Sequence, residues 1–378
     1  MKRASAPYER RSIAAVLLLV ALLLGAAVEP VGAHPRAVFP AQSLGNRGID
    51  VVALQHLLRG TGRQVTVSGV FGAGTQSAVV AFQKVSGLKA DGVVNAATWE
   101  RLAPRLDSAV RGESVIALQK QLNKKRRAGL TINGVLDGAT RGAVRTFQKH
   151  MGLNVTGVVN TTTWRNLLWH YVYPGFQANP LCDYHSGNGS AANWGTAAAV
   201  GQLEAAAVLF NRRTGLKVSV GELSWEHGGS IRGHATHEVG LDVDLGLIRR
   251  DGRHCRRLGL SYKQAQYDRA KTRQLIRAIY EAAPGQVRLI YFNDPVLVRE
   301  GIVVPYPRHD DHLHVRYCQV GHALKRYRCP APQLIAADAA QLLTSDARSE
   351  VGEAITDLQP LAGGLRPVGI LDLLWRSR

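Results

Sequence analysis

The chain has 378 residues, of which 46% are hydrophobic and 20% are charged. This length and composition exclude a single small domain and an intrinsically disordered protein, and they predict two or three folded domains. The formal net charge of +19 at pH 7 predicts attraction to a polyanion, which could be nucleic acid, an anionic membrane surface or an anionic cell wall.

Residues 1–33 have the layout of a secretory signal peptide. Basic residues precede an unbroken apolar run at 13–28, which is shorter than the roughly 20 residues of a membrane span. The residues at 31–33 then fit the site that a signal peptidase cleaves. We therefore expect an exported protein, periplasmic or secreted, with no stable membrane insertion after cleavage; an uncleaved N-terminal anchor is the alternative. Export also argues against a nucleic-acid partner.

Residues 42–170 contain an internal repeat. Leu54-Gln55 recurs as Leu118-Gln119, Phe82-Gln83-Lys84 recurs as Phe147-Gln148-Lys149, and Trp99 recurs as Trp164. We therefore divide this segment into two units, 42–104 and 106–170. In each unit, apolar residues at helical spacing and turns marked by glycine predict three short helices around a small core.

These recurring motifs resemble those of the peptidoglycan-binding domain of the small three-helix type. The shared pattern has a G-x-x-V-x-x-L-Q opening, an A-V-x-x-F-Q-K helix and a G-V-V-N-x-x-T-W close. The resemblance implies binding to wall glycan or its stem peptides, so peptidoglycan is the expected partner; a helical spacer without a ligand is the alternative. We expect the histidines of this half, His56, His150 and His170, to be isolated surface residues.

The second half predicts an α+β domain at 180–330. After a linker rich in Pro, Gly, Asn and Ser at 171–190, the pattern predicts helices at 194–211 and 263–283 and strands at 216–220 and 287–292. Because helices and strands do not alternate regularly, we expect a central antiparallel sheet. The segment 331–378 is rich in Ala and Leu, and we assign it no function.

All four cysteines, Cys182, Cys255, Cys318 and Cys329, lie in this second half. An even number in an exported protein predicts two disulfides, for which three pairings exist. We expect Cys182 to pair with Cys329, which would join the two ends of the domain, and Cys255 to pair with Cys318. Zinc binding by these cysteines is the alternative, which the lack of a C-x-x-C pair disfavours.

Two segments are dense in histidine and aspartate, one ending near position 245 and one beginning near position 309. Side chains two positions apart on a strand share a face, so Asp242 and Asp244 point the same way, as do His312 and His314. If the two strands pair, these side chains converge, and His237 on the preceding loop can complete the set. Two imidazoles and one carboxylate with an open fourth position describe a catalytic zinc site, where the metal lowers the pKa of a bound water.

Residues 180–330 resemble the penicillin-insensitive murein endopeptidases, which belong to the zinc peptidase group of the D-Ala-D-Ala carboxypeptidases and lysostaphin-like enzymes. That group carries H-x6-D followed much later by H-x-H, and the closer family adds a histidine three positions before each motif. The matching residues here are, in chain order, His234, His237, Asp244, His309, His312 and His314. The resemblance implies a zinc metallopeptidase that hydrolyses peptide cross-links in peptidoglycan, with D-alanyl bonds as the expected target.

The resemblance implies that His237, Asp244 and His314 bind zinc and that Asp242 orients one of the ligand histidines. Non-haem Fe(II) is the alternative metal for two histidines and one carboxylate. His237 and Asp244 are seven positions apart and so lack the H-x-D spacing usual for such iron sites, and an oxidising compartment disfavours Fe(II). The sequence therefore favours zinc.

Three further histidines receive catalytic roles from the same resemblance. His312 would be the general base, while His234 and His309 would flank the metal, polarise the scissile carbonyl or, in the case of His234, join the ligand set. A D,D-carboxypeptidase that uses the same site is the alternative activity, and a non-catalytic wall-binding protein is the alternative outside the enzymes. We expect a monomer associated with the cell wall. Four other histidines, for which we expect structural roles, are His185, His227, His254 and His322.

Overall fold

The computed structural model describes residues 37–107, 110–183, 189–256 and 259–329. By their contacts, all of them belong to one unit of the chain. The predicted signal peptide at 1–33 and the segment 331–378 lie outside the described residues. Within the described ranges, no helix is long and apolar enough to cross a membrane.

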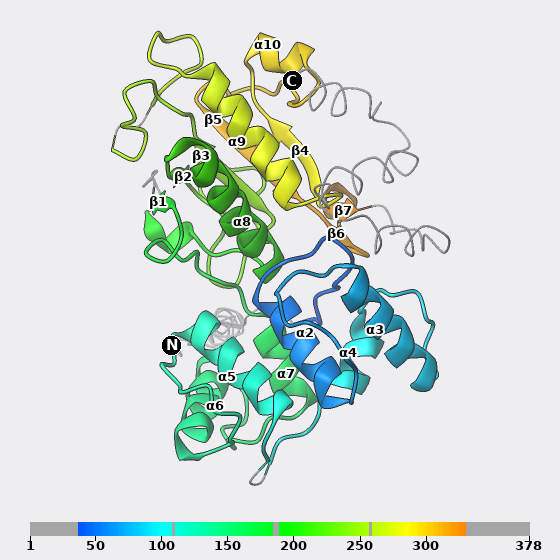
Figure 1. Cartoon of the computed structure of the whole chain (residues 1–378). Helices are drawn as coiled ribbons and strands as arrows, with labels where there is room; N and C mark the ends of the chain where they lie inside the picture. Colours follow the sequence, from blue (N-terminus) through cyan, green and yellow to red (C-terminus); the bar gives the residue numbers. More distant parts are fainter. Residues whose placement is uncertain (1–36, 108–109, 184–188, 257–258, 330–378) are drawn as a thin grey trace, which may run out of the picture. The chain divides into compact units, whose positions relative to one another are not determined.

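The helices of the first half come in two sets of three, as the repeat predicts (Figure 1). The first set is α2 (Ile49–Gly60), α3 (Ala73–Val85) and α4 (Ala96–Leu102). The second set is α5 (Glu113–Arg126), α6 (Gly138–His150) and α7 (Thr161–Trp169). The last helix of each set follows an asparagine, Asn95 or Asn160, whose side chain accepts a hydrogen bond from a backbone N–H of the first turn. This bond satisfies a donor that has no partner within the helix.

The structural role of the recurring glutamines explains why the Leu-Gln motif appears in both repeats. Gln55 is fully buried; its side-chain oxygen accepts from the N–H of Gly69 at 2.9 Å and its nitrogen donates to the carbonyl of Val70 at 2.9 Å. Gln119 makes the same two bonds, at 3.0 and 3.1 Å, in the matching turn of the second repeat. A buried side-chain amide that hydrogen-bonds to the backbone groups of a turn fixes the conformation of that turn. The Leu-Gln motif therefore has a structural role.

The two repeats pack through α2 and α5 and share one hydrophobic core. At this contact, Lys125 Nζ lies 2.8 Å from Asp50 Oδ1, and both side chains are buried. Lys125 also donates to the backbone carbonyls of Leu167 and Leu168 in α7. The buried ion pair therefore joins helices from both repeats.

The second half is built on a five-stranded sheet with the order β1-β2-β3-β5-β4. The strands are β1 (Leu181–Asp183), β2 (Val218–Val220), β3 (Asp242–Gly246), β4 (Val287–Tyr291) and β5 (His312–Tyr317). All neighbours pair antiparallel except β1, which is parallel to β2. The predicted α+β class is confirmed, and the sheet has an antiparallel centre with one parallel edge strand.

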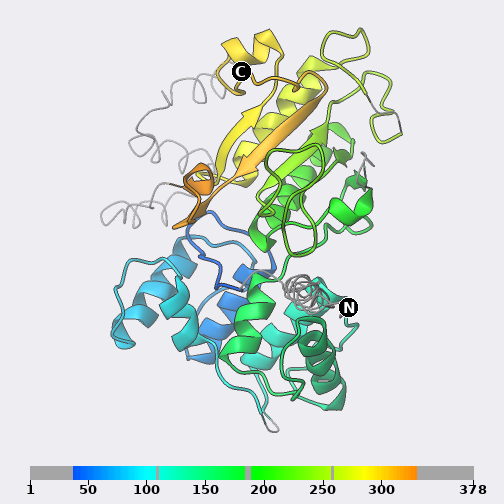
Figure 2. The same ribbon diagram turned by 180° about the vertical axis from the view of Figure 1, so that it is seen from behind.

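Helices α8 (Ala197–Thr214) and α9 (Arg269–Ala282) lie side by side on one face of this sheet (Figures 1 and 2). Val243 and Leu245 of β3 and Leu313 and Val315 of β5 are fully buried in the core that the helices cover. Because side chains alternate along a strand, the aspartates of β3 and the histidines of β5 point to the opposite face. The smaller elements are η1 (Ser190–Ala192), α10 (Pro295–Arg299), β6 (Gln319–Val320), η2 (Lys325–Tyr327) and β7 (Arg328–Cys329).

The predicted disulfide pairing is wrong. Cys182 is bonded to Cys255, with Cα atoms 5.8 Å apart, and Cys318 is bonded to Cys329, with Cα atoms 5.1 Å apart. The reason is local: β6 follows directly after Cys318 and pairs with β7, which ends at Cys329. Cys329 is therefore held beside Cys318 and cannot reach the start of the domain.

The two long helices begin later than the sequence pattern suggests. The expected starts were 194 and 263, whereas α8 begins at Ala197 and α9 at Arg269. In each case the preceding residue, Thr196 or Asp268, accepts a hydrogen bond from a backbone N–H of the first turn. Such caps fix a helix start more sharply than hydrophobic spacing does.

Candidate functional site

The candidate site lies on the face of the sheet away from α8 and α9. The predicted pairing of the two motif strands is confirmed: β3 and β5 run antiparallel, with Asp244 opposite His314 and Asp242 opposite Arg316. His237 lies on the loop before β3 with a positive φ of 67°, a conformation that costs a non-glycine residue about 1–3 kcal/mol. Its backbone N–H is held there by Asp242 Oδ2 at 3.1 Å.

Three potential ligand atoms converge at this point. His237 Nε2 lies 3.2 Å from His314 Nδ1 and 3.3 Å from Asp244 Oδ1, and His314 Nδ1 lies 3.0 Å from the same oxygen. The Nδ1–H of His237 faces the carbonyl of Leu223 at 3.0 Å, so Nε2 carries a lone pair toward the site. Ligands about 2.0–2.1 Å from a tetrahedral zinc ion are about 3.3 Å apart. The three side chains therefore fit one such ion.

Asp242 holds His314 from the other side of its ring. Asp242 Oδ1 lies 3.0 Å from His314 Nε2, so the Nε2–H donates to Asp242 and Nδ1 faces the ligand cluster, where a metal ion would take the place of its proton. Burial lowers the pKa of His314, but hydrogen bonds to Asp242 and Asp244 outweigh burial and raise it to about 9. Burial raises the pKa of Asp244, but His237 and His314 together bring it well below its usual value. The site thus favours a positive charge between its two carboxylates.

His234 lies at the edge of this cluster. Its Nδ1 is 3.6 Å from Asp244 Oδ2, its Nε2 is 3.5 Å from Glu222 Oε2, and its ring centroid is 4.6 Å from that of His237. The hydrogen bond with Glu222 is the main cause that raises the pKa of His234, and the charge of Asp244 adds to it. His234, His237 and Asp244 each offer a ligand atom, and these atoms lie within 4.8 Å of one another. The structure therefore places His234 where it can contact either a metal or a bound substrate.

His312 and His309 line the other side. His312 Nδ1 lies 2.8 Å from Asp311 Oδ1, and its Nε2 lies 3.8 Å from Asp244 Oδ1. Burial lowers the pKa of His312, but the hydrogen bond with Asp311 outweighs burial and raises it. The ring centroid of His309 lies 4.8 Å from that of His312, with the two rings tilted by 41°, and burial lowers the pKa of His309. The structure thus brings together all six residues that the sequence selected.

Several residues at the site had no clear signal in the sequence. Glu222 is a lone acidic residue among apolar neighbours after β2, and Tyr327 donates to Asp242 Oδ2 at 2.5 Å from far along the chain. The rings of Tyr291 and Tyr306 stack at 4.6 Å, and His309 lies 5.3 Å from the first of them. These tyrosines form an aromatic wall beside the histidines.

The expectation that His56, His150 and His170 are isolated surface residues is wrong. His56 is only 6% exposed, and its Nδ1 contacts Glu113 at 2.5 Å. His170 is fully buried. His150 and His170 lie with Glu226 and His227 in a second cluster of potential ligands. Among the histidines expected to be structural, His254 contacts the carbonyl of Lys217 at 2.8 Å, whereas His185 lies outside the described residues.

Comparisons with known proteins identify the repeats. The family described as "Putative peptidoglycan binding domain" matches residues 47–102 and again residues 111–167. A solved peptidoglycan-binding protein from Clostridioides difficile, in complex with glutamine hydroxamate, is 42% identical over 17% of this chain and 40% of its own, with a TM-score of 0.17. The endolysin of Burkholderia phage AP3 is 27% identical over 29% of this chain and 38% of its own, with a TM-score of 0.17.

The matched region thus spans about two fifths of each of these two solved structures. None of the curated proteins matches the chain. The two family matches fall on the two sets of three helices, α2 to α4 and α5 to α7. The chain therefore carries two peptidoglycan-binding domains.

Proposed function

We propose that this protein is a zinc-dependent peptidase that hydrolyses peptide cross-links in peptidoglycan, D-alanyl bonds in particular, while its two repeats hold it on the wall. The observation that carries the proposal is the convergence of His237 Nε2, His314 Nδ1 and Asp244 Oδ1 within 3.3 Å of one another. The two peptidoglycan-binding domains on the same chain support peptidoglycan as the substrate.

The side chains of the site fit zinc by their chemistry as well as by their spacing. Two imidazole nitrogens and one carboxylate oxygen are common ligands of catalytic zinc, and His237, His314 and Asp244 would hold it. When bound, zinc would supply a Lewis acid that polarises the scissile carbonyl and lowers the pKa of the attacking water.

The surrounding residues would carry out proton transfer and charge stabilisation. His312 would take the proton from the attacking water and pass it to the leaving amine, with its ring oriented by the bond to Asp311. His234 and His309 lie on either side of the ligand cluster, from where an N–H can donate to the carbonyl oxygen as negative charge develops. The aromatic wall of Tyr291 and Tyr306 would orient the peptide beside His309.

We also infer an exported, wall-associated monomer. Two disulfides within one chain, Cys182–Cys255 and Cys318–Cys329, are typical of oxidising compartments. The formal net charge of +19 would concentrate the protein on an anionic wall.

Product analysis on purified sacculi tests the proposal. Wild-type protein should release peptides by cutting cross-linked dimers, whereas free D-alanine released from persisting dimers would indicate the alternative carboxypeptidase. His312→Ala should keep wall binding and zinc content but lose cleavage by at least about 100-fold, the lower end for a general base. His322→Ala, on the turn between β6 and β7, is the matched control and should remain active. If wild type and His312→Ala leave sacculi equally intact, the chain is a wall-binding protein without this activity.

A further inference from the structure

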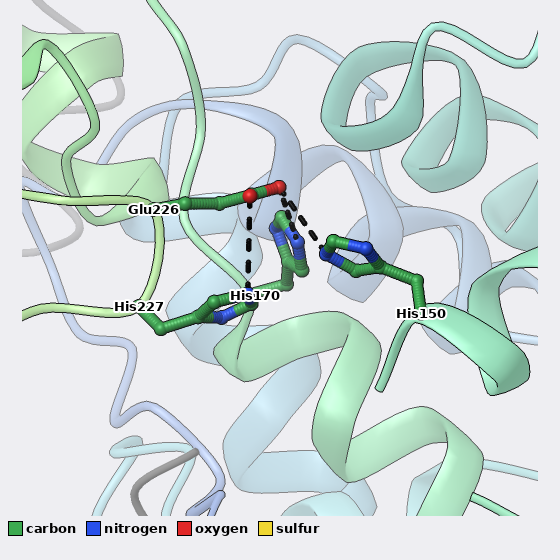
Figure 3. A group of neighbouring side chains, drawn as sticks. All are labelled: His150, His170, Glu226 and His227. Atoms are coloured by element: carbon green, nitrogen blue, oxygen red, sulfur yellow. Dashed lines mark ion pairs between the residues drawn. The ribbon is translucent and has the colours of Figure 1, made fainter. Parts of the chain in front are cut away.

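A second group of potential metal ligands shares no residue with the proposed active site (Figure 3). His150 ends α6, His170 follows the end of α7, and Glu226 and His227 lie on the loop after β2. The Nε2 atoms of His150 and His170 each lie 3.3 Å from Glu226 Oε1, and His227 Nε2 lies 4.0 Å from Glu226 Oε2. One ligand atom from each of the four residues lies within 4.8 Å of all the others.

Hydrogen bonding turns the ring of His170 toward this point. Its Nδ1 lies 2.8 Å from the carbonyl of Tyr171, so the Nδ1–H donates to the backbone, as metal-ligand histidines commonly do. With the proton on Nδ1, the neutral ring carries its lone pair on Nε2, the atom that faces Glu226. A lone pair and the carboxylate of Glu226, 3.3 Å apart, repel each other unless a cation lies between or beside them.

Arg126, at the end of α5, supplies one such cation. Its Nη1 donates to Glu226 Oε1 and lies 3.2 Å from His170 Nε2. A single guanidinium nitrogen thus contacts two members of the cluster. The second oxygen of Glu226, Oε2, is the one nearer to His227. A divalent ion would bring two positive charges to the same place and could be held by all four members. Arg126 is thus a competitor for the lone pair of His170.

The remaining histidines are also held in place. The ring of Trp169 stacks on that of His227 at 5.7 Å with an interplanar angle of 11°. The ring centroids of His150, His170 and His227 lie 5.0 to 5.6 Å from one another. The three rings therefore surround one carboxylate from different elements, as Figure 3 shows.

We propose that His150, His170, Glu226 and His227 form a second zinc site, distinct from the one at His237. Three imidazoles and one carboxylate are a nitrogen and oxygen set that suits zinc, and four protein ligands leave no position open for substrate. Such a site is structural. It would fasten helices α6 and α7 of the second repeat to the loop that leads into His237, and so couple wall binding to the position of a catalytic ligand.

Zinc content of the full chain tests this inference. After removal of metal by a chelator and reloading with zinc, wild type should retain two zinc ions per chain. The double substitution His150→Asn with His227→Asn should retain one, His237→Ala should retain one, and the combined variant should retain none. His322→Asn is the matched control and should retain two. If the double substitution retains the wild-type content, the inference is overturned.

This design separates the second site from the proposed function. Loss of zinc in the double variant but not in His237→Ala would support the second site and refute the active-site proposal. Loss of zinc in His237→Ala but not in the double variant would support the active-site proposal and refute the second site.

A second measurement does not depend on folding of the double variant. Zinc should raise the melting temperature of His237→Ala, and Arg126→Gln added to that background should bind zinc several-fold more tightly because a competitor is gone. No shift with zinc in His237→Ala would overturn the inference.

Discussion

Replacement of Asp242 by asparagine should destabilise the chain far more than the small change in shape suggests. The carboxylate is fully buried and accepts from four donors. The donors are the backbone N–H of His237 at 3.1 Å, Nε2 of His314 at 3.0 Å, Nε of Arg316 at 2.7 Å and the hydroxyl of Tyr327 at 2.5 Å. Asparagine keeps one accepting oxygen and presents N–H donors at the other position, so donors on that side lose their acceptor.

The expected magnitude follows from these contacts. An unsatisfied buried donor costs about 1–3 kcal/mol, and a buried ion pair that loses one partner costs about 3–5 kcal/mol. Since Arg316 keeps its charge beside the asparagine, Asp242→Asn should lower the free energy of unfolding by about 3–5 kcal/mol. Tyr327→Phe removes one donor and leaves the carboxylate, so it should cost only about 1.5–3 kcal/mol.

Urea denaturation of the full chain, with disulfides intact and a chelator present, measures both losses without a contribution from metal binding. Tryptophan fluorescence and far-UV circular dichroism should report the same transition for each variant. A loss below about 0.5 kcal/mol for Asp242→Asn, the range of ordinary surface substitutions, would refute the role of this carboxylate as the buried anchor of the site. Equal losses for Asp242→Asn and Tyr327→Phe would refute the charge argument.

Three further predictions concern stability elsewhere. Lys125→Met leaves the buried carboxylate of Asp50 without its cation and should cost about 3–5 kcal/mol; adding Asp50→Asn should recover part of this in thermal melts, and no recovery would contradict the ion-pair explanation. Burial raises the pKa of Glu226, but nearby histidines and an arginine bring it to about 2, so its stabilisation is present above pH 4.5 and lost as the pH falls toward 2. Acid titration followed by circular dichroism should therefore show a shallower loss for Glu226→Gln, and an unchanged curve would count against this. Serine at both Cys182 and Cys255 opens a loop with a sequence separation of 73 and should cost about 4 kcal/mol, seen as a lower melting temperature; an unchanged one would contradict it.

The strand pattern made the core of the candidate site predictable. The period of two places Asp242 with Asp244 and His312 with His314 on one face, and the pairing of β3 with β5 brings the two faces together. The repeated words made the helical domains equally predictable, because buried residues such as Gln55 perform the same task in both copies.

The features that the sequence did not reveal depend on contacts between distant segments. The disulfide partners were not predictable because the pairing of β6 with β7 sets the position of Cys329, and nothing in the spacing of the cysteines shows that. The second histidine cluster combines α6, α7 and a loop from the other half of the chain, so His150 and His170 look isolated in sequence. Glu222 and Tyr327 reach the site from positions without any motif.

Anomalous diffraction at the zinc edge from crystals of the zinc-loaded full chain tests the central claim most directly. The account predicts a peak about 2.0–2.2 Å from His237 Nε2, His314 Nδ1 and Asp244 Oδ1 together. Zinc bound only elsewhere on the chain, with these three side chains still in mutual contact, would contradict it.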